Sequence, residues 1–156
     1  MKNLIYLCLA VCMATTAGFA QKITDKDLQG TWNLVALDAL SSQGIYLDLA
    51  NNDVKFSEEA EAQAPPEALA QAKESMGPTI DMLKQMKMII NGNEIKQSIP
   101  GDEQTGVYSI VNEEDMQKLK IIYADGTGDN VEFYMKDKKL HVNLGEDGLF
   151  IYSKEQ

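Results

Sequence analysis

The sequence predicts an all-β protein, an antiparallel up-and-down barrel of about eight strands with a helix-turn-helix insert after the first strand. Two observations predict the barrel: short segments alternate apolar with polar residues, and tight-turn sequences separate them at intervals of roughly eight to twelve residues. A third observation predicts the insert, because one segment near the first strand repeats its apolar residues at helical spacing instead. One apolar and one polar face on each strand is the pattern of a barrel wall.

The first predicted strand begins at Gly30-Thr31-Trp32-Asn33-Leu34 and contains the only tryptophan of the chain. Trp32, Leu34 and Ala36 alternate with their neighbours, so they share one face of the strand. A small barrel needs a bulky side chain near one end, and buried aromatic residues mostly pack. We therefore expect Trp32 to plug the barrel rather than to contact a ligand.

The insert is predicted at about residues 57–88, after a segment (45–49) that fits a strand or an extended loop. Pro65-Pro66 suits the first turn of a helix, and Gly77-Pro78 separates a first helix from a second. Methionine and leucine side chains along the insert form either a lid over the barrel or the face that docks the helices onto it. The residues concerned are Met76, Leu83 and Met86.

The strands after the insert are predicted from alternation and from turns such as Asn91-Gly92-Asn93, a strong hairpin signal. The predicted strands span 86–90, 94–99, 105–111, 119–123, 131–136, 140–144 and 149–153. With the strand at Trp32 they complete the barrel, and the short turns make neighbouring strands antiparallel.

Residues 1–20 have the features of a signal peptide: a lysine near the start, a short apolar run and small residues before Gln21. The apolar run is too short to span a bilayer, so we expect an exported protein, periplasmic or secreted, with one domain at 21–156. Both cysteines, Cys8 and Cys12, lie in this leader. Lipid anchoring through Cys12 is less favoured, because the branched Val11 precedes it.

The chain has 156 residues, a net charge of −10 and no arginine. Such a chain is poorly suited to nucleic acid or to anionic membrane surfaces, which require clustered basic residues. His141, the only histidine, is expected at the surface, and no cluster of residues suggests a metal, a cofactor or a catalytic dyad. Residues 125–132 carry acidic side chains without calcium-loop spacing, so a solvated hairpin is favoured. We expect a monomer that is not an enzyme.

Four features of the sequence resemble the bacterial lipocalin-like domain family, within the calycin group. They are the strand starting Gly30-Thr31-Trp32, the helical insert, the strand Thr105-Gly106-Val107-Tyr108 and the terminal aromatic strand. The resemblance implies a barrel that holds a small hydrophobic ligand. The family commonly packs an arginine on the tryptophan; here Lys154 is expected over the ring. The arginine that anchors fatty-acid carboxylates is also missing beside Tyr152, so a neutral or weakly polar ligand is expected.

The sequence thus predicts a non-catalytic binding protein whose inward strand faces bury a small hydrophobic molecule. The candidate ligand-binding residues in the barrel interior are Tyr108 (a possible polar anchor), Leu119, Ile121, Phe133, Met135, Leu140, Val142 and Tyr152. The alternative is a packed barrel without ligand, since small barrels are often filled by their own side chains. It would act through its acidic surface as an inhibitor or a protein-interaction module.

Overall fold

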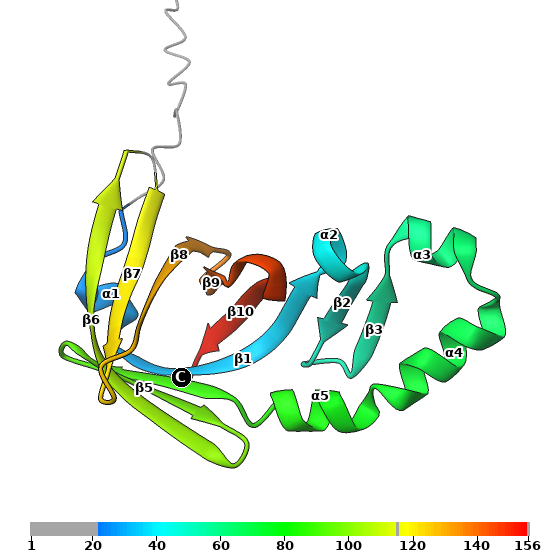
Figure 1. Cartoon of the computed structure of the whole chain (residues 1–156), viewed down its shortest axis with the longest axis horizontal. Coiled ribbons are helices and arrows are strands. Elements are labelled where there is room, and N and C mark those ends of the chain that lie inside the picture. The colour runs from blue at the N-terminus through cyan, green and yellow to red at the C-terminus, as the bar shows by residue number, and fades with distance from the viewer. Residues whose placement is uncertain (1–21, 115, 156) are drawn as a thin grey trace, which may run out of the picture.

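The computed structural model describes residues 22–114 and 116–155. The predicted signal peptide, with Cys8 and Cys12, lies outside them. Within the described residues ten strands form one antiparallel sheet, and eight of them close into a barrel through pairing of the last strand with the first (Figure 1). The barrel strands are β1 (Gly30–Ala39), β4 (Lys87–Asn91), β5 (Glu94–Ile99), β6 (Asp102–Glu113), β7 (Met116–Tyr123), β8 (Gly128–Lys136), β9 (Lys139–Asn143) and β10 (Leu149–Lys154). The predicted fold class is confirmed.

Strand β1 closes the barrel because it pairs with three other strands. Its first half pairs with β4, where Trp32 lies opposite Met88, and it pairs with β10, where Leu34 lies opposite Tyr152. An irregularity between Leu34 and Ala36 shifts the register with β10. Beyond this bulge the second half of β1 has left β4, and its edge pairs with β2 instead.

The insert is larger than the sequence predicts and begins with a hairpin. After the short helix α2 (Leu40–Gln43), β2 (Ile45–Asp48) and β3 (Asp53–Phe56) extend the sheet beyond β1. The segment 45–49, which fitted a strand or a loop, is thus largely strand β2, because the free edge of β1 needs a hydrogen-bonding partner. Three helices follow in place of two: α3 (Glu58–Gln63), α4 (Pro66–Ser75) and α5 (Gly77–Leu83) (Figure 1).

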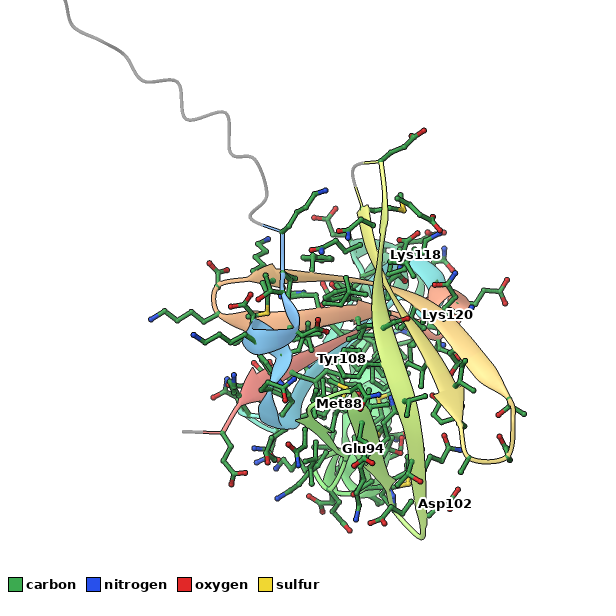
Figure 2. All side chains as sticks on the ribbon, turned by 90° about the vertical axis from the view of Figure 1, so that its left-hand side faces the viewer. Met88, Glu94, Asp102, Tyr108, Lys118 and Lys120 are labelled. Atoms are coloured by element: carbon green, nitrogen blue, oxygen red, sulfur yellow. The ribbon has the colours of Figure 1, made fainter. Side chains whose placement is uncertain are left out.

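The antiparallel order places alternate connections at opposite ends of the barrel. The end of the barrel that carries helix α1 (Asp25–Leu28) and the hairpins β4–β5, β6–β7 and β8–β9 is called the closed end. The open end carries the β5–β6 and β7–β8 turns, the insert and the β9–β10 connection with the 3₁₀ helix η1 (Gly145–Asp147). Figure 2 shows Asp102 at the tip of the β5–β6 hairpin, far from Lys118.

The closed end is packed and hydrogen-bonded. Trp32 is 1% exposed, and its indole N–H donates to the carbonyl oxygen of Leu28 over 2.7 Å. The Lys154 Nζ lies 5.3 Å from the centre of the indole ring, where the sequence predicts it. The side-chain amide of Gln117 clamps the chain before α1, accepting from the Ile23 N–H (2.7 Å) and donating to its carbonyl (3.0 Å). These contacts bury Trp32 at this end, and its role as a plug stays a prediction.

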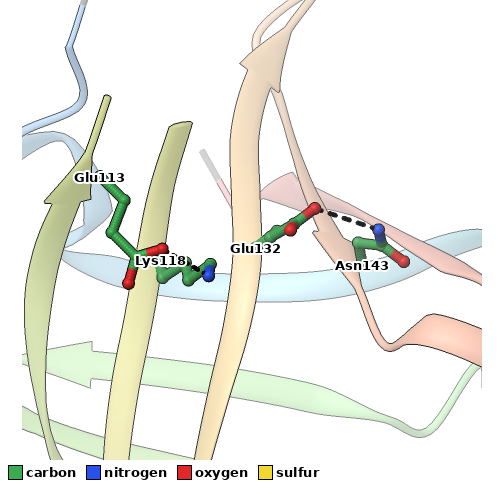
Figure 3. Close-up of polar contacts among 4 residues, drawn as sticks. All are labelled: Glu113, Lys118, Glu132 and Asn143. Carbon is green, nitrogen blue, oxygen red and sulfur yellow. Dashed lines mark hydrogen bonds and ion pairs between the residues drawn. The ribbon is translucent and has the colours of Figure 1, made fainter. Parts of the chain in front are cut away.

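The outer face of the barrel carries polar side chains in register. Lys118, Glu132 and Asn143 lie side by side on β7, β8 and β9. Figure 3 shows the Lys118 Nζ paired with Glu113 Oε2 at 2.6 Å and the Asn143 amide donating to Glu132 Oε2 at 3.4 Å. The apolar side chains at alternate positions, such as Leu119 and Phe133, are buried inside. The alternation in the sequence therefore separates interior from exterior as expected.

His141 is an exception, because the prediction of a surface position is wrong. It points away from the interior between Leu140 and Val142, yet only 8% of it is exposed. The ring of Tyr134 stacks on it, with centroids 4.7 Å apart and planes 16° from parallel. Among the described residues its Nδ1 has no hydrogen-bond partner. An aromatic neighbour on the adjacent strand can thus bury an outward-facing side chain.

We expect Trp32→Phe to lower the free energy of unfolding by about 2–4 kcal/mol, because it leaves the buried Leu28 carbonyl unpaired and shrinks the plug. Urea unfolding followed by circular dichroism measures the change. The control Lys154→Met removes the cation over the ring but keeps much of the side chain, and should cost less than about 1 kcal/mol. A Trp32→Phe variant as stable as the wild type would contradict this role for the plug.

A second prediction concerns pH. Burial, aided by the charges of Lys136 and Lys139, lowers the pKa of His141 below its ordinary value of 6.5. The unfolded chain therefore binds a proton more readily, so the stability contributed by neutral His141 is complete above about pH 6.5 and is lost as the pH falls. Between about pH 7 and pH 5, the wild type should lose more stability than His141→Phe, which keeps the stacked ring. Equal losses in urea titrations at both pH values would refute the prediction.

Candidate functional site

A cavity of about 190 Å³ lies inside the open half of the barrel. Much of its wall is apolar and comes from strands β4, β7, β8, β9 and β10. The apolar lining includes Met88, Leu119, Ile121, Val131, Val142 and Phe150. The inward faces of strands from most of the barrel meet here, as the alternation predicts. A concave site of this kind is the default position for a bound molecule.

The structure brings half of the predicted ligand-binding residues to this cavity. Leu119, Ile121, Val142 and Tyr152 line it. Phe133, Leu140 and Met135 instead belong to the packed core and do not line the cavity. Their side chains help to fill the interior, so the barrel is solid in one part and hollow in another. A ligand-binding role for these residues stays a prediction.

Tyr108, the predicted polar anchor, lies elsewhere. Its hydroxyl donates to the carbonyl of Gly92 and accepts from the Gln29 side chain, both over 3.2 Å, next to the β4–β5 hairpin of the closed end. Burial, then the nearby Asp25 carboxylate, raises the pKa of Tyr108 to about 12. The hydroxyl is therefore engaged in holding the closed end together, away from the cavity.

The three residues predicted as a lid have different positions. Met86 lines the cavity, and its carbonyl accepts a hydrogen bond from the Leu34 N–H over 3.2 Å, which fixes it to β1. Leu83 is buried and Met76 half-buried in the hydrophobic core that also contains Ile80. No residue of α3 or α4 is among those lining the cavity. Among the described residues, the insert thus reaches the rim of the cavity only through its last segment, at Met86. Met76 and Leu83 instead pack the insert against the hydrophobic core.

Polar residues at the cavity were missed by sequence reasoning. Tyr123 donates its hydroxyl proton to Asp129 Oδ2 over 2.8 Å, and both residues line the cavity. Burial, then this hydrogen bond, raises the pKa of Tyr123 well above its ordinary value. Alternation contained the signal, since Tyr123 follows Leu119 and Ile121 along β7, and Asp129 precedes Val131 along β8. Gln97, Ser98 and Gln104 add further polar groups to the lining.

Tyr152 contributes a further polar group. It is 7% exposed, and burial raises its pKa to about 12, so the hydroxyl keeps its proton. No protein group in residues 22–114 and 116–155 forms a hydrogen bond with this hydroxyl. A buried tyrosine normally finds a hydrogen-bond partner. Because Tyr152 lines the cavity, its hydroxyl is available to a bound molecule or to water.

Two glycines let the strands approach closely at this end. A Cβ at Gly128 would lie 2.7 Å from the Ile121 carbonyl oxygen, and one at Gly106 would lie 2.6 Å from that of Ile122. Any other residue would force β6, β7 or β8 apart at these points. Gly106 lies opposite Tyr123, and Gly128 directly precedes Asp129, so both close approaches are next to these cavity residues.

The open end is acidic around the cavity. A surface hollow between the β5–β6 and β7–β8 turns shares Gln104, Tyr123 and Asp129 with the cavity and also contains Asp102 and Asp125. Hydrogen bonds from the Thr127 side chain and main chain lower the pKa of Asp125, so it stays ionised.

A basic residue, Lys87, is also among those lining the cavity. Its exposed side chain alternates with the buried Met88 along β4, so it belongs to the outer face.

Two further properties concern only the residues that the structure describes. Within them no three or more His, Cys, Asp or Glu residues are grouped to hold a metal ion. None of the helices in that part of the chain has the length and hydrophobicity needed to cross a bilayer.

Comparison with known proteins gives one structural similarity. No family model and no curated protein matches the chain. Among solved structures it is similar to a DUF4847 family protein from Bacteroides vulgatus, with 12% sequence identity and a TM-score of 0.46. The similarity covers 82% of this chain and 95% of that protein.

We expect Gly128→Ala to lower the free energy of unfolding by about 2 kcal/mol or more, because its Cβ would collide with the Ile121 carbonyl. The matched control is Gly77→Ala, at the start of α5, where nothing lies within 4 Å of the position that a Cβ would take and φ is not positive. That variant should be neutral or slightly stabilising. Urea unfolding of both variants checks the prediction; similar stabilities would contradict it.

Proposed function

We propose that this protein is an exported, lipocalin-like binding protein that holds a small hydrophobic molecule in the cavity of the open end. The body of the ligand is neutral or weakly polar. The observation that carries the proposal is the cavity, whose wall combines Leu119, Ile121 and Val142 with a few polar groups. Sites for small molecules have this composition, in which apolar walls supply affinity and sparse polar groups supply orientation.

The volume of the cavity limits the ligand to a compact molecule. A cavity of roughly 150 Å³ is enough to hold benzene, so about 190 Å³ accommodates one ring with a short substituent or a short branched chain. A long acyl chain does not fit without displacement of the rim. The missing arginine beside Tyr152 agrees with this, because a fatty-acid carboxylate has no guanidinium partner here.

Burial alone supports modest affinity. A ligand of this size removes about 200 Å² of apolar surface from water, which at about 25 cal/mol per Å² gives about 5 kcal/mol. That corresponds to a Kd of about 0.2 mM before the costs of association. Tighter binding therefore requires the polar groups of the lining, such as Tyr123, Asp129 and Tyr152.

Two other parts of the proposal have separate support. Export rests on the signal-peptide features of residues 1–20. A role without catalysis is supported by the position of His141, the only histidine, which packs against Tyr134 on the outer face and does not line the cavity.

Native mass spectrometry of the protein purified from its own host tests the proposal. We expect a retained small molecule, and we expect Val131→Trp to abolish it, because the indole fills the cavity from β8. The matched control is Ile122→Trp on neighbouring β7, where the side chain is 48% exposed and faces outward. This control should retain the molecule as the wild type does.

A different result would favour the alternative function. If the wild type carries no molecule and one protein partner co-purifies through the acidic surface, the barrel is an interaction module instead. Retention that is equal in Val131→Trp and in the wild type would also contradict binding in this cavity. Thermal melts of both tryptophan variants establish that each is folded before the comparison.

A further inference from the structure

The polar groups at the cavity suit one particular ligand chemistry, because the charged residue of the lining, apart from the outward-facing Lys87, is Asp129. Asp129 Oδ2 accepts the hydroxyl proton of Tyr123 over 2.8 Å, which orients the carboxylate and leaves its second oxygen without a partner in the described part of the chain. Tyr152 as a residue is 7% exposed and belongs to the same lining, and its hydroxyl also has no partner in that part of the chain. These oxygens are acceptors for a donor supplied by a ligand.

Aromatic rings accompany the carboxylate. Tyr123, Phe150 and Tyr152 all line the cavity together with Asp129. The faces of aromatic rings attract cations, and a hydrogen bond between an ammonium group and a carboxylate is about twice as strong as one between neutral groups. Rings beside an oriented carboxylate are therefore complementary to an ammonium group carried on an apolar body.

The surroundings of the cavity favour the same sign of charge. Asp102 and Asp125 belong to the hollow that shares Tyr123 and Asp129 with the cavity. Asp147 lies on the β9–β10 connection of the same end, in a second hollow that also contains Asp129. The whole chain carries −10, and carboxylates gathered at a cavity raise the local concentration of cations. The lysine at the rim, Lys87, has its side chain on the outer face.

We propose that the polar end of the ligand is a protonated amine, bound by the Asp129 carboxylate and the rings of Tyr123 and Tyr152, while its apolar body fills the cavity. This inference rests on the proposed function and departs from it in one respect, because the polar end of the ligand carries a positive charge. The ligand class is a small aromatic or branched aliphatic amine rather than a fully neutral molecule or an anion.

The test compares four probes of nearly one shape: benzylamine, benzyl alcohol, toluene and benzoate. Isothermal titration calorimetry on the purified protein measures the affinity for each at neutral pH. We expect benzylamine to bind about tenfold more tightly than benzyl alcohol, and benzoate to bind most weakly, because the charge-assisted contact is available only to the amine.

Variants locate the contact. Asp129→Asn should reduce the affinity for benzylamine about tenfold and change that for benzyl alcohol less than about twofold. The matched control Asp102→Asn removes the same charge from the same end but from outside the cavity lining, and should change both affinities by less than about twofold. Tyr123→Phe, which removes the bond that orients Asp129, should lower the benzylamine affinity by a smaller factor.

The outcomes separate the inference from the proposed function. If benzyl alcohol and toluene bind as well as benzylamine, or if Asp102→Asn and Asp129→Asn have equal effects, the amine assignment is wrong while cavity binding stands. If none of the four probes binds but the native spectra show a retained molecule that Val131→Trp abolishes, the amine assignment is wrong while cavity binding stands. If the native spectra of the wild type also show no molecule, both are overturned. Preference for benzylamine that disappears in Asp129→Asn alone supports the inference.

Discussion

The barrel depends on strand β1, which is bonded to two barrel neighbours at once and carries Trp32 where they meet. Met88 of β4 and Lys154 of β10 both lie opposite Trp32, so the residue sits at the seam that closes the sheet. The hydrogen bond from its indole to the Leu28 carbonyl, 2.7 Å long, attaches helix α1 beneath the same seam. The same residue, Trp32, therefore lies where the sheet closes into a barrel and where helix α1 covers one end of it.

The fixed closed end determines where space remains. Polar groups there satisfy one another: Gln117 binds the main chain of Ile23, and Tyr108 binds Gln29 and Gly92. The middle is filled by Leu140 and Phe133, which are 0% and 3% exposed. In the cavity lining, by contrast, the Tyr152 hydroxyl has no partner among the described residues. One polar group without a partner is thus beside the cavity, where the proposed ligand would meet it, and another, His141 Nδ1, lies on the outer face.

Sequence reasoning succeeded where the physical signal is local, since alternation defined the strands and their inner faces. It did not give the depth of a residue along the barrel, because depth depends on register and on which turns share an end. Tyr108 and Tyr123 both lie on inner faces, yet one holds the closed end and the other faces the cavity. The segment 45–49 forms a strand because the β1 bulge leaves an edge without a partner, and His141 is buried by Tyr134 of the adjacent strand. In each case a neighbour in space decides the outcome, and no pattern within the segment contains that information.

Contacts at the rim also fix the positions of the strands around this small cavity. On one side the Leu34 N–H binds the Met86 carbonyl, which ties the end of the insert to β1. On the other, Gly106 and Gly128 allow β6, β7 and β8 to approach more closely than side chains permit. The hollow that shares Tyr123 and Asp129 with the cavity lies on this second side. If the cavity binds an amine as proposed, a molecule arriving from that hollow passes Asp129, so the residues proposed to recognise the ligand also lie on its approach.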